Sequence, residues 1–215
     1  MDLKGCIFDL DGVIVDTARY HFLAWQRLAG EMGFAFTEDS NEALKGVSRM
    51  ASLEILLSLG GLEKSDEEKI ELATRKNNWY VEYISRMTPD DILPGSAELL
   101  GLLRAEGILT AIGSASRNAG IILDRIGLRK MFDAIVDGNK IHRAKPDPEV
   151  FLKAAEELGL PAENCVVFED ARAGVEAALA GGMKCVGVGS PANLGRAHVV
   201  VPDLKSISIK QIRKL

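Results

Sequence analysis

Four acidic side chains directly follow apolar runs, where they could act on phosphorus. Asp9 and Asp11 follow the first apolar run of the chain, and Glu169 and Asp170 follow a later one. One carboxylate of such a pair can attack as a nucleophile, and the other can transfer a proton. Two carboxylates about 4 Å apart repel by roughly 4 kcal/mol at an effective dielectric constant of about 20, and a phosphate adds to this repulsion. A divalent cation with hard oxygen ligands removes it, so the four acids predict a Mg²⁺ site.

Two further features could hold a phosphate. The segment 113–116, Gly-Ser-Ala-Ser, leads from an apolar run into a helical pattern. The Ser114 hydroxyl and the free N–H groups at the helix start are therefore candidate donors to an anion. Lys145 is held extended by Pro146 and could place its ammonium beside developing negative charge on phosphoryl oxygens.

Each of these features also has a purely structural interpretation. The Asp-Leu-Asp-Gly segment at 9–12 could be a solvated turn, and Asp170 or Ser116 could simply cap a helix. Lys145 could be a solvated lysine in a loop. Because ligands of an open parallel sheet gather beyond the carboxyl ends of its strands, the conjunction of all four features at such ends favours a phosphoryl-transfer site.

The elements that must position these residues alternate along most of the chain. Apolar runs that predict strands buried on both faces lie at 6–8, 109–112, 165–168 and 185–188. Helical patterns lie between them, such as 97–105 and 150–158, the latter with Asp147 as N-cap and Pro148 at the first helical position. This alternation predicts an α/β fold, a doubly wound, Rossmann-like and mostly parallel sheet with helices on both faces.

Residues 17–88 interrupt the alternation, because they hold several helical patterns and no strand pattern. Ser48 is a plausible N-cap, Gly60-Gly61 ends the helix that follows it, and 70–84 has the spacing of a longer helix. The chain then passes through Pro89 and Pro94, which disfavour helix continuation. We therefore expect a core domain made of 1–16 and 89–215, with 17–88 inserted as a helical cap domain.

The composition indicates which classes of binding partner and which cellular compartment to expect. The net charge is −5, with 26 Lys and Arg scattered among 31 Asp and Glu, which makes nucleic acid an unexpected partner. No apolar stretch is long enough for a membrane span, and the N-terminus lacks the pattern of a secretory signal. Cys6, Cys165 and Cys185 each sit in an apolar run without CxxC spacing, so we expect small buried side chains in a cytoplasmic protein.

The four motifs Asp-Leu-Asp-Gly-Val, Gly-Ser-Ala-Ser, Ala-Lys-Pro and Phe-Glu-Asp, in this order, closely resemble those of the haloacid dehalogenase superfamily of phosphotransferases. The resemblance spans the whole predicted core. It implies Asp9 as nucleophile and Asp11 as general acid and base. It also implies phosphate ligands at Ser114, Ala115 and Lys145, and Mg²⁺ held by Asp9, the Asp11 carbonyl, Glu169 and Asp170.

The cap carries a narrower resemblance, to the β-phosphoglucomutase family, in segments such as Asp-Thr-Ala at 16–18, Leu-Lys-Gly-Val-Ser-Arg at 44–49 and Arg-Lys-Asn at 75–77. It implies that the non-transferring phosphate is held by Arg49, Ser116, Arg117 and Asn118. Sugar contacts would come from Lys45, Gly46, Val47 and Ser52. Closure and support of Asp11 would come from Thr17, His21 and Lys76, with Trp25 in the substrate site although its spacing also fits the core. Two positions depart from the family pattern, Gly113 in place of alanine and Arg117 in place of lysine.

This resemblance implies interconversion of β-D-glucose 1-phosphate and β-D-glucose 6-phosphate through an aspartyl-phosphate and a β-glucose 1,6-bisphosphate. The alternative within the superfamily is a Mg²⁺-dependent sugar-phosphate phosphatase, in which water accepts the phosphoryl group. A non-catalytic phosphosugar-binding module is a third possibility, which the intact acids and lysine disfavour. A dehalogenase is less compatible, since it needs neither Asp11 nor the metal-binding acids. We expect a monomer that acts on a small phosphosugar.

Overall fold

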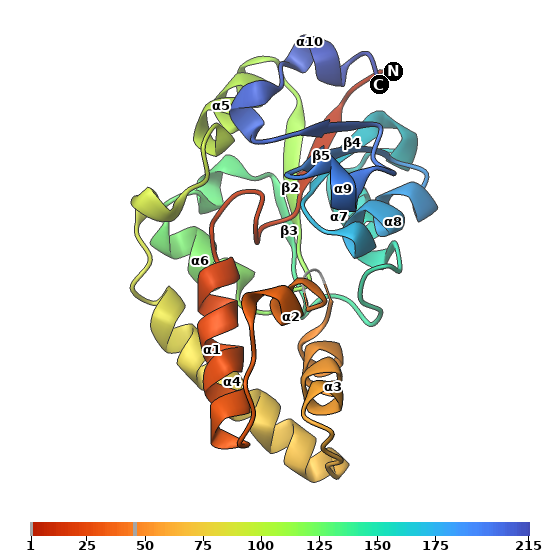
Figure 1. The fold of residues 1–215 in the computed structure, drawn as a ribbon. Helices are drawn as coiled ribbons and strands as arrows, with labels where there is room; N and C mark the ends of the chain where they lie inside the picture. Colours follow the sequence, from red (N-terminus) through yellow and green to blue (C-terminus); the bar gives the residue numbers. More distant parts are fainter. Residues whose placement is uncertain (1, 45–46) are drawn as a thin grey trace.

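The core of the computed structural model, which describes residues 2–44 and 47–215, is a six-stranded parallel sheet in the order β3-β2-β1-β4-β5-β6 (Figure 1). The strands are β1 Gly5–Phe8, β2 Leu109–Gly113, β3 Ala134–Val136, β4 Cys165–Glu169, β5 Lys184–Val188 and β6 Val199–Val201. The doubly wound parallel sheet expected from the alternation is confirmed. All four predicted strands form, and the two edge strands β3 and β6 were missed because three residues are too few to show a pattern.

Helices cover both faces of the sheet, and this is why its strands are continuous apolar runs. Phe8 of β1 stacks on Phe168 of β4, with ring centroids 4.5 Å apart, on the face covered by α5, α6 and α10. Ile7 and Val167 point to the other face, which is covered by α7, α8 and α9. The core helices are α5 Ser96–Ala105, α6 Ala119–Arg125, α7 Glu149–Glu157, α8 Arg172–Ala180, α9 Pro191–Leu194 and α10 Ile209–Ile212.

Four helices form the cap below the carboxyl ends of the strands (Figure 1), and it has an apolar cluster of its own. They are α1 Ala18–Glu31, α2 Glu38–Glu42, α3 Arg49–Leu59 and α4 Asp66–Ile84. The cluster is built from one face of each long helix, with Trp25 and Leu28 from α1, Leu53 and Leu56 from α3, and Ala73 from α4. No strand occurs in 17–44 or 47–88, as the sequence predicted. None of the described helices combines the length and the apolar character needed to cross a bilayer.

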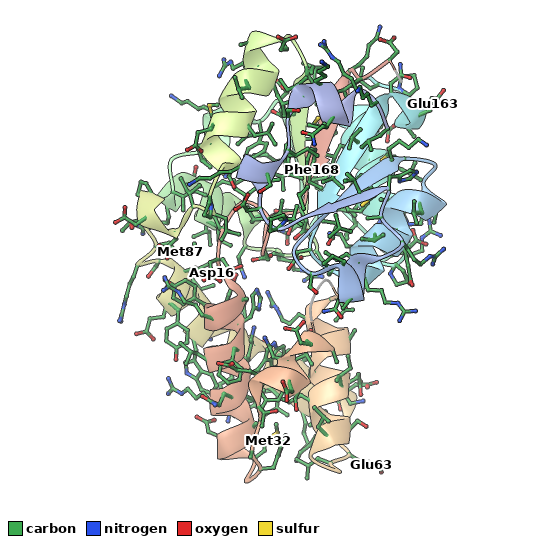
Figure 2. The ribbon with its side chains drawn as sticks, turned by 45° about the horizontal axis from the view of Figure 1, so that its top comes forward. Asp16, Met32, Glu63, Met87, Glu163 and Phe168 are labelled. Carbon is green, nitrogen blue, oxygen red and sulfur yellow. The ribbon has the colours of Figure 1, made fainter. Side chains whose placement is uncertain are left out.

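The two chain segments that join cap and core lie side by side, as the positions of Asp16 and Met87 show in Figure 2. The Asp16 N–H donates to the Asp91 carbonyl at 3.1 Å, and Arg19 pairs with the Asp91 carboxylate. Asp91 belongs to a short 3-10 helix, Pro89–Asp91, at the place where the prolines predicted the return to the core. The junction is therefore held by several short-range contacts.

Helix boundaries agree with the sequence analysis in most places. Ser48 caps α3 by accepting from the Ala51 N–H at 3.2 Å, as predicted. The N-cap of α7 was predicted one residue too early, because the helix begins at Glu149 and Pro148 is its N-cap. Asp147 nevertheless accepts from the Glu149 N–H at 3.0 Å, so its carboxylate still serves a free donor of the first turn. The five-residue α2 was not predicted, since it is too short to show helical periodicity.

Candidate active site

Strand register brings the motifs to one edge of the sheet. Phe8 at the end of β1 pairs with Ile112 of β2 on one side and with Phe168 of β4 on the other. The next residue, Asp9, is tied to β4 by its N–H, which donates to the Phe168 carbonyl at 2.9 Å. Ser114 follows β2 in the same way, with its N–H donating to Val136 of β3 at 3.0 Å. Hydrogen bonds to the neighbouring strands therefore fix the backbone of Asp9 and of Ser114.

Lys145 bridges two of the predicted acids in a buried cluster. Its Nζ donates to Asp9 Oδ1 at 2.5 Å and to Glu169 Oε1 at 2.5 Å. The second Glu169 oxygen accepts from the Ala171 N–H at 2.7 Å, so both oxygens of this carboxylate are engaged. Burial alone would lower the pKa of Lys145, but the charges of Asp9 and Glu169 outweigh it and raise the pKa above its ordinary value. The ammonium is therefore charged and holds Asp9 in place.

Asp11 is supported by the cap. The Thr17 hydroxyl donates to Asp11 Oδ1, and His21 Nε2 lies 3.9 Å from the same oxygen. Burial and the nearby charge of Asp9 raise the pKa of Asp11 to about 6, and the Thr17 hydrogen bond offsets part of the increase. A carboxyl group with such a pKa can both accept and donate a proton near neutral pH, which is what a general acid and base requires.

His21 in turn contacts a buried lysine of α4. Lys76 Nζ lies 3.0 Å from His21 Nδ1 and above the rings of Trp25 and Tyr80, at 4.4 and 4.8 Å from their centroids. Burial and the charge of Arg49 lower the pKa of Lys76 to about 7. Burial and the charge of Lys76 lower the pKa of His21, so the imidazole is neutral. Because Lys76 can donate to Nδ1, the proton of the ring is assigned to Nε2, on the side of Asp11.

A cavity of about 570 Å³ lies between the core and the cap, and most of the predicted residues line it. Those that do are Asp9, Asp11, His21, Trp25, Val47, Arg49, Ser52, Lys76, Ala115, Ser116, Arg117, Asn118 and Asp170. Four predicted residues are buried behind the wall instead, namely Thr17, Ser114, Lys145 and Glu169. The remaining two, Lys45 and Gly46, lie outside the described residues.

Two arginines from different domains line this cavity. Arg49 begins α3 in the cap, and Arg117 follows β2 in the core. Burial and the charge of Arg117 lower the pKa of Arg49, which shows that the two guanidinium groups repel each other. An anion between them would relieve this repulsion. Asn118 beside them donates to Asn77 of α4 at 3.0 Å, a hydrogen bond that joins core and cap.

The segment after β2 that was predicted to bind an anion is held in shape by its own hydroxyls. Ser114 Oγ accepts from the Ser116 N–H at 3.0 Å, and Ser116 Oγ accepts from the Asn118 N–H at 3.2 Å. The N-cap position of α6 belongs to Asn118 and not to Ser116. The alternative that Ser116 is merely the N-cap of this helix therefore fails, and its side chain lines the cavity.

The acids at the strand ends suit a hard cation such as Mg²⁺ that takes only some of its oxygen ligands from the protein. Asp9, Asp11 and Asp170 line the cavity, whereas Glu169 does not. Gly12 has a φ of +84°, and a Cβ there would overlap the Asp170 carboxylate, so glycine allows the Asp11 loop to approach Asp170. Within 2–44 and 47–215, no group of three or more acidic, histidine or cysteine side chains is placed to hold a metal ion by itself. Magnesium commonly binds through one or two carboxylates and completes its shell with water and phosphate, which suits this arrangement.

Asn77 and Tyr80 of α4 are among the cavity residues that were not predicted as functional. With Ala73 and Lys76 they follow the spacing i, i+3, i+4 and i+7, so all four lie on one face of α4. The sequence analysis recognised the helical spacing of 70–84 but gave Asn77 no role of its own in the site. A polar residue among positions that otherwise form the buried face of a helix could have indicated that this face borders a site.

Comparisons with known proteins agree with this geometry. The chain is 44% identical over 214 residues to the β-phosphoglucomutase of Bacillus subtilis, covering 99% of this chain and 95% of that protein. It is 34% identical over 199 residues to the phosphorylated carbohydrates phosphatase of Thermotoga maritima, covering 91% and 89% of the two chains. The crystal structure of a β-phosphoglucomutase from Clostridium difficile superposes with a TM-score of 0.95 at 42% identity, covering 99% of this chain and 96% of that one.

A family model covers most of the same residues. The model described as haloacid dehalogenase-like hydrolase matches residues 3–182, a range that holds all four motifs and the whole cap. The superfamily resemblance drawn from these motifs is thereby confirmed. The chain belongs to the haloacid dehalogenase-like hydrolase family.

Proposed function

We propose that this chain is a β-phosphoglucomutase, an enzyme that interconverts β-D-glucose 1-phosphate and β-D-glucose 6-phosphate. The observation that carries the proposal is one cavity holding both the acid pair Asp9 and Asp11 and a second group of phosphate donors around Arg49 and Arg117. A mutase must hold the phosphate that is not transferred while it transfers the other. Relatives that bear this activity in their names, at 44% and 42% identity, support the proposal.

The chemistry assigned to the core is phosphoryl transfer through Asp9. The phosphorylated Asp9 gives its phosphoryl group to O6 of β-glucose 1-phosphate, while Asp11 takes the proton from that hydroxyl. The resulting β-glucose 1,6-bisphosphate reorients, and Asp9 attacks the phosphorus at C1. Asp11 returns the proton to the departing O1, which leaves β-glucose 6-phosphate and the phosphorylated enzyme. The pKa of about 6 supports both proton transfers by Asp11.

Asp9, the Asp11 carbonyl and Asp170 would hold Mg²⁺, which neutralises charge on the phosphoryl oxygens when it is bound. Lys145 and Ser114 would contact the phosphoryl group at Asp9, and Ala115, which lines the cavity, is assigned to the same group. Glu169, whose two oxygens bind Lys145 and the Ala171 N–H, would act by orienting Lys145. Ser116, Arg117 and Asn118 would join Arg49 at the second phosphate.

The cap would decide which acceptor reacts. Favouring a sugar hydroxyl over water by ~100-fold requires a barrier difference of about 2.7 kcal/mol. A cap made of residues 17–88, closing on a core made of 1–16 and 89–215, excludes water and brings its own side chains to the sugar. Val47, Ser52 and Trp25 line the cavity from the cap side and are assigned to sugar contacts, together with Lys45 and Gly46.

We also propose a cytoplasmic monomer with a small phosphosugar as its substrate. All three cysteines are buried and free, which suits a reducing compartment.

A coupled assay tests the proposed activity. β-Glucose 1-phosphate is supplied with Mg²⁺ and a trace of β-glucose 1,6-bisphosphate, and glucose 6-phosphate and free phosphate are measured side by side. We expect glucose 6-phosphate to form much faster than free phosphate. Release of free phosphate without glucose 6-phosphate would identify a phosphatase and end the proposal.

Substitution of Arg49 gives a second readout in the same assay. Arg49→Ala should lower mutase turnover strongly, because the second phosphate loses a charged donor. The matched control is Arg86→Ala, since Arg86 lies in the cap, has a side chain that is 73% exposed and pairs with Glu82. The control should keep the parent rate. Equal rates for Arg49→Ala and the control would contradict the role given to Arg49.

A further inference from the structure

The hydroxyl of Tyr80 differs from the other buried polar groups of the described chain. Tyr80 is 1% exposed, and its Oη is the only buried side-chain nitrogen or oxygen among residues 2–44 and 47–215 without a hydrogen-bond partner. The residue also lines the cavity between core and cap. Buried hydroxyls are nearly always paired, because an unpaired one loses its bonds to water without replacement. An unpaired donor in a binding cavity therefore points to a partner that comes with the ligand.

The ring of Tyr80 is held on two sides, so its hydroxyl has a fixed position. The His21 ring lies against it, with centroids 4.0 Å apart and an interplanar angle of 31°. Lys76 Nζ lies 4.8 Å from the same ring centroid. Tyr80 stands four residues after Lys76 on α4, so both side chains leave the helix on one face. The hydroxyl is thus placed before any ligand binds.

The surroundings of the hydroxyl indicate which ligand atom it could meet. Its polar neighbours are the Thr17 and Ser116 hydroxyls, which lie close enough to lower its pKa by weak hydrogen bonding, although neither reaches the full geometry of a hydrogen bond. The charges of Asp11 and Arg49 also act on it. Burial and the charge of Asp11 raise its pKa well above the ordinary value, so at neutral pH it remains a neutral donor. It therefore makes no well-formed hydrogen bond, and it lies beside two of the groups assigned to the second phosphate.

We propose that Tyr80 is a phosphosugar-binding residue whose hydroxyl donates a hydrogen bond to an oxygen of the non-transferring phosphate, beside Arg49 and Ser116. This role rests on the proposed mutase function and adds a neutral donor from α4 to a phosphate site otherwise built from α3 and the loop after β2. The phosphate changes places with the transferred one during each cycle. A donor fixed at the wall would serve β-glucose 1-phosphate and β-glucose 6-phosphate alike.

The substitution Tyr80→Phe removes the hydroxyl and keeps the ring. A hydrogen bond to a charged oxygen is usually strong enough that its loss should raise KM for β-glucose 1-phosphate by about 10- to 100-fold. Binding of β-glucose 1,6-bisphosphate, measured by calorimetry in an Asp9→Asn background, should weaken by a similar factor. Without ligand, the melting temperature of Tyr80→Phe should stay equal or rise, because an unpaired buried polar atom has been removed.

The matched control is Tyr83→Phe, on the same helix but outside the cavity lining. It should leave KM unchanged. A Tyr80→Phe variant with parent KM and parent bisphosphate affinity would overturn the proposal, and so would a lower melting temperature with unchanged KM, which would mark a structural hydroxyl. If the parent chain itself makes no glucose 6-phosphate, the mutase function fails first. A parent that converts the sugar while Tyr80→Phe binds it equally well refutes the Tyr80 role alone.

Discussion

Replacing Lys145 with methionine tests whether the buried ammonium holds the acid cluster together. Methionine is of similar length but carries no charge. In the parent, Lys145 Nζ lies 2.5 Å from both Asp9 Oδ1 and Glu169 Oε1, and the side chains of Lys145 and Glu169 are fully enclosed. Lys145→Met leaves these two carboxylates in one buried site without the cation that separates them. The same substitution removes a proposed phosphate ligand, so activity should also be lost.

The size of the effect follows from these distances. At 2.5 Å and an effective dielectric constant of about 20, each contact corresponds to roughly 7 kcal/mol of attraction, most of which offsets the desolvation of the charges. Removing one partner of a buried ion pair usually costs about 3–5 kcal/mol of stability. We expect this loss for Lys145→Met near neutral pH and above.

The loss should depend on pH in a defined direction. The pKa of Lys145 is raised in the folded state, so its contribution is fully present below the unfolded pKa of a lysine and is lost only as pH rises through the folded value. Burial already raises the pKa of Glu169 to about 7 in the parent, and loss of the Lys145 charge should raise it further, so the variant regains stability as Glu169 takes up a proton. The difference between parent and variant should therefore shrink as pH falls from about 8 toward 5.

Urea unfolding followed by circular dichroism, without Mg²⁺, measures this difference. The control is Lys64→Met, since Lys64 pairs with Glu68 on the cap surface and should cost less than about 1 kcal/mol. Addition of Mg²⁺ should restore part of the stability of Lys145→Met, because a cation returns to the acids. A loss below about 1 kcal/mol, or one that is the same at both pH values, would refute the reasoning.

Three further outcomes are expected. Asp11→Asn should slow turnover in the coupled assay by ~10²–10⁴, the usual contribution of a general acid and base, and a smaller loss would contradict the role of Asp11. Lys76→Met should be more stable than the parent at pH 6, because the pKa of Lys76 is lowered from 10.5 to about 7 in the folded state. The free-energy cost of burying the charged amine is fully present below pH 7 and disappears as pH rises from 7 to 10.5. Thermal melts should show this gain narrowing toward pH 10, and a gain that does not change with pH would be inconsistent with it. Removal of Mg²⁺ with a chelator should abolish turnover and its return should restore it, whereas full activity in the chelator would exclude the metal role.

The central strands and the position of the candidate site were predictable from the sequence, and the reasons are local. A strand that is buried on both faces has a continuous apolar sequence, so β1, β2, β4 and β5 could be predicted. Parallel strands end at the same edge, so the acids that follow β1 and β4 were expected to meet. Asp9 and Glu169 do meet, through Lys145.

The contacts between cap and core were not predictable in the same way. Asn77 and Asn118 are far apart in sequence, and their hydrogen bond depends on how α4 approaches the loop after β2. The unpaired state of the Tyr80 hydroxyl also depends on what surrounds it in three dimensions. Glu169 illustrates the reverse case, because its position after β4 suggested a metal ligand while the fold turns it toward Lys145 and the Ala171 N–H. Spacing predicts which edge a side chain reaches, and packing decides what it touches there.

The support of Asp11 connects the acid and base to the position of the cap. Asp11 lies in the core loop after β1, but the hydroxyl that binds it belongs to Thr17, the first residue of the proposed cap. The imidazole of His21, which faces the same oxygen, stands on α1 and is positioned by Lys76 of α4. Asp11 is therefore oriented only when these two cap helices lie where the structure has them, and in that position the cap also covers the cavity. In the proposed mechanism, water would reach a phosphorylated Asp9 most easily when the cap is displaced, and Asp11 would then lack the groups that orient it. The position of the cap thus determines both the enclosure of the cavity and the orientation of Asp11. In this way a fold that could hydrolyse a phosphosugar can favour phosphoryl transfer to a sugar hydroxyl over transfer to water.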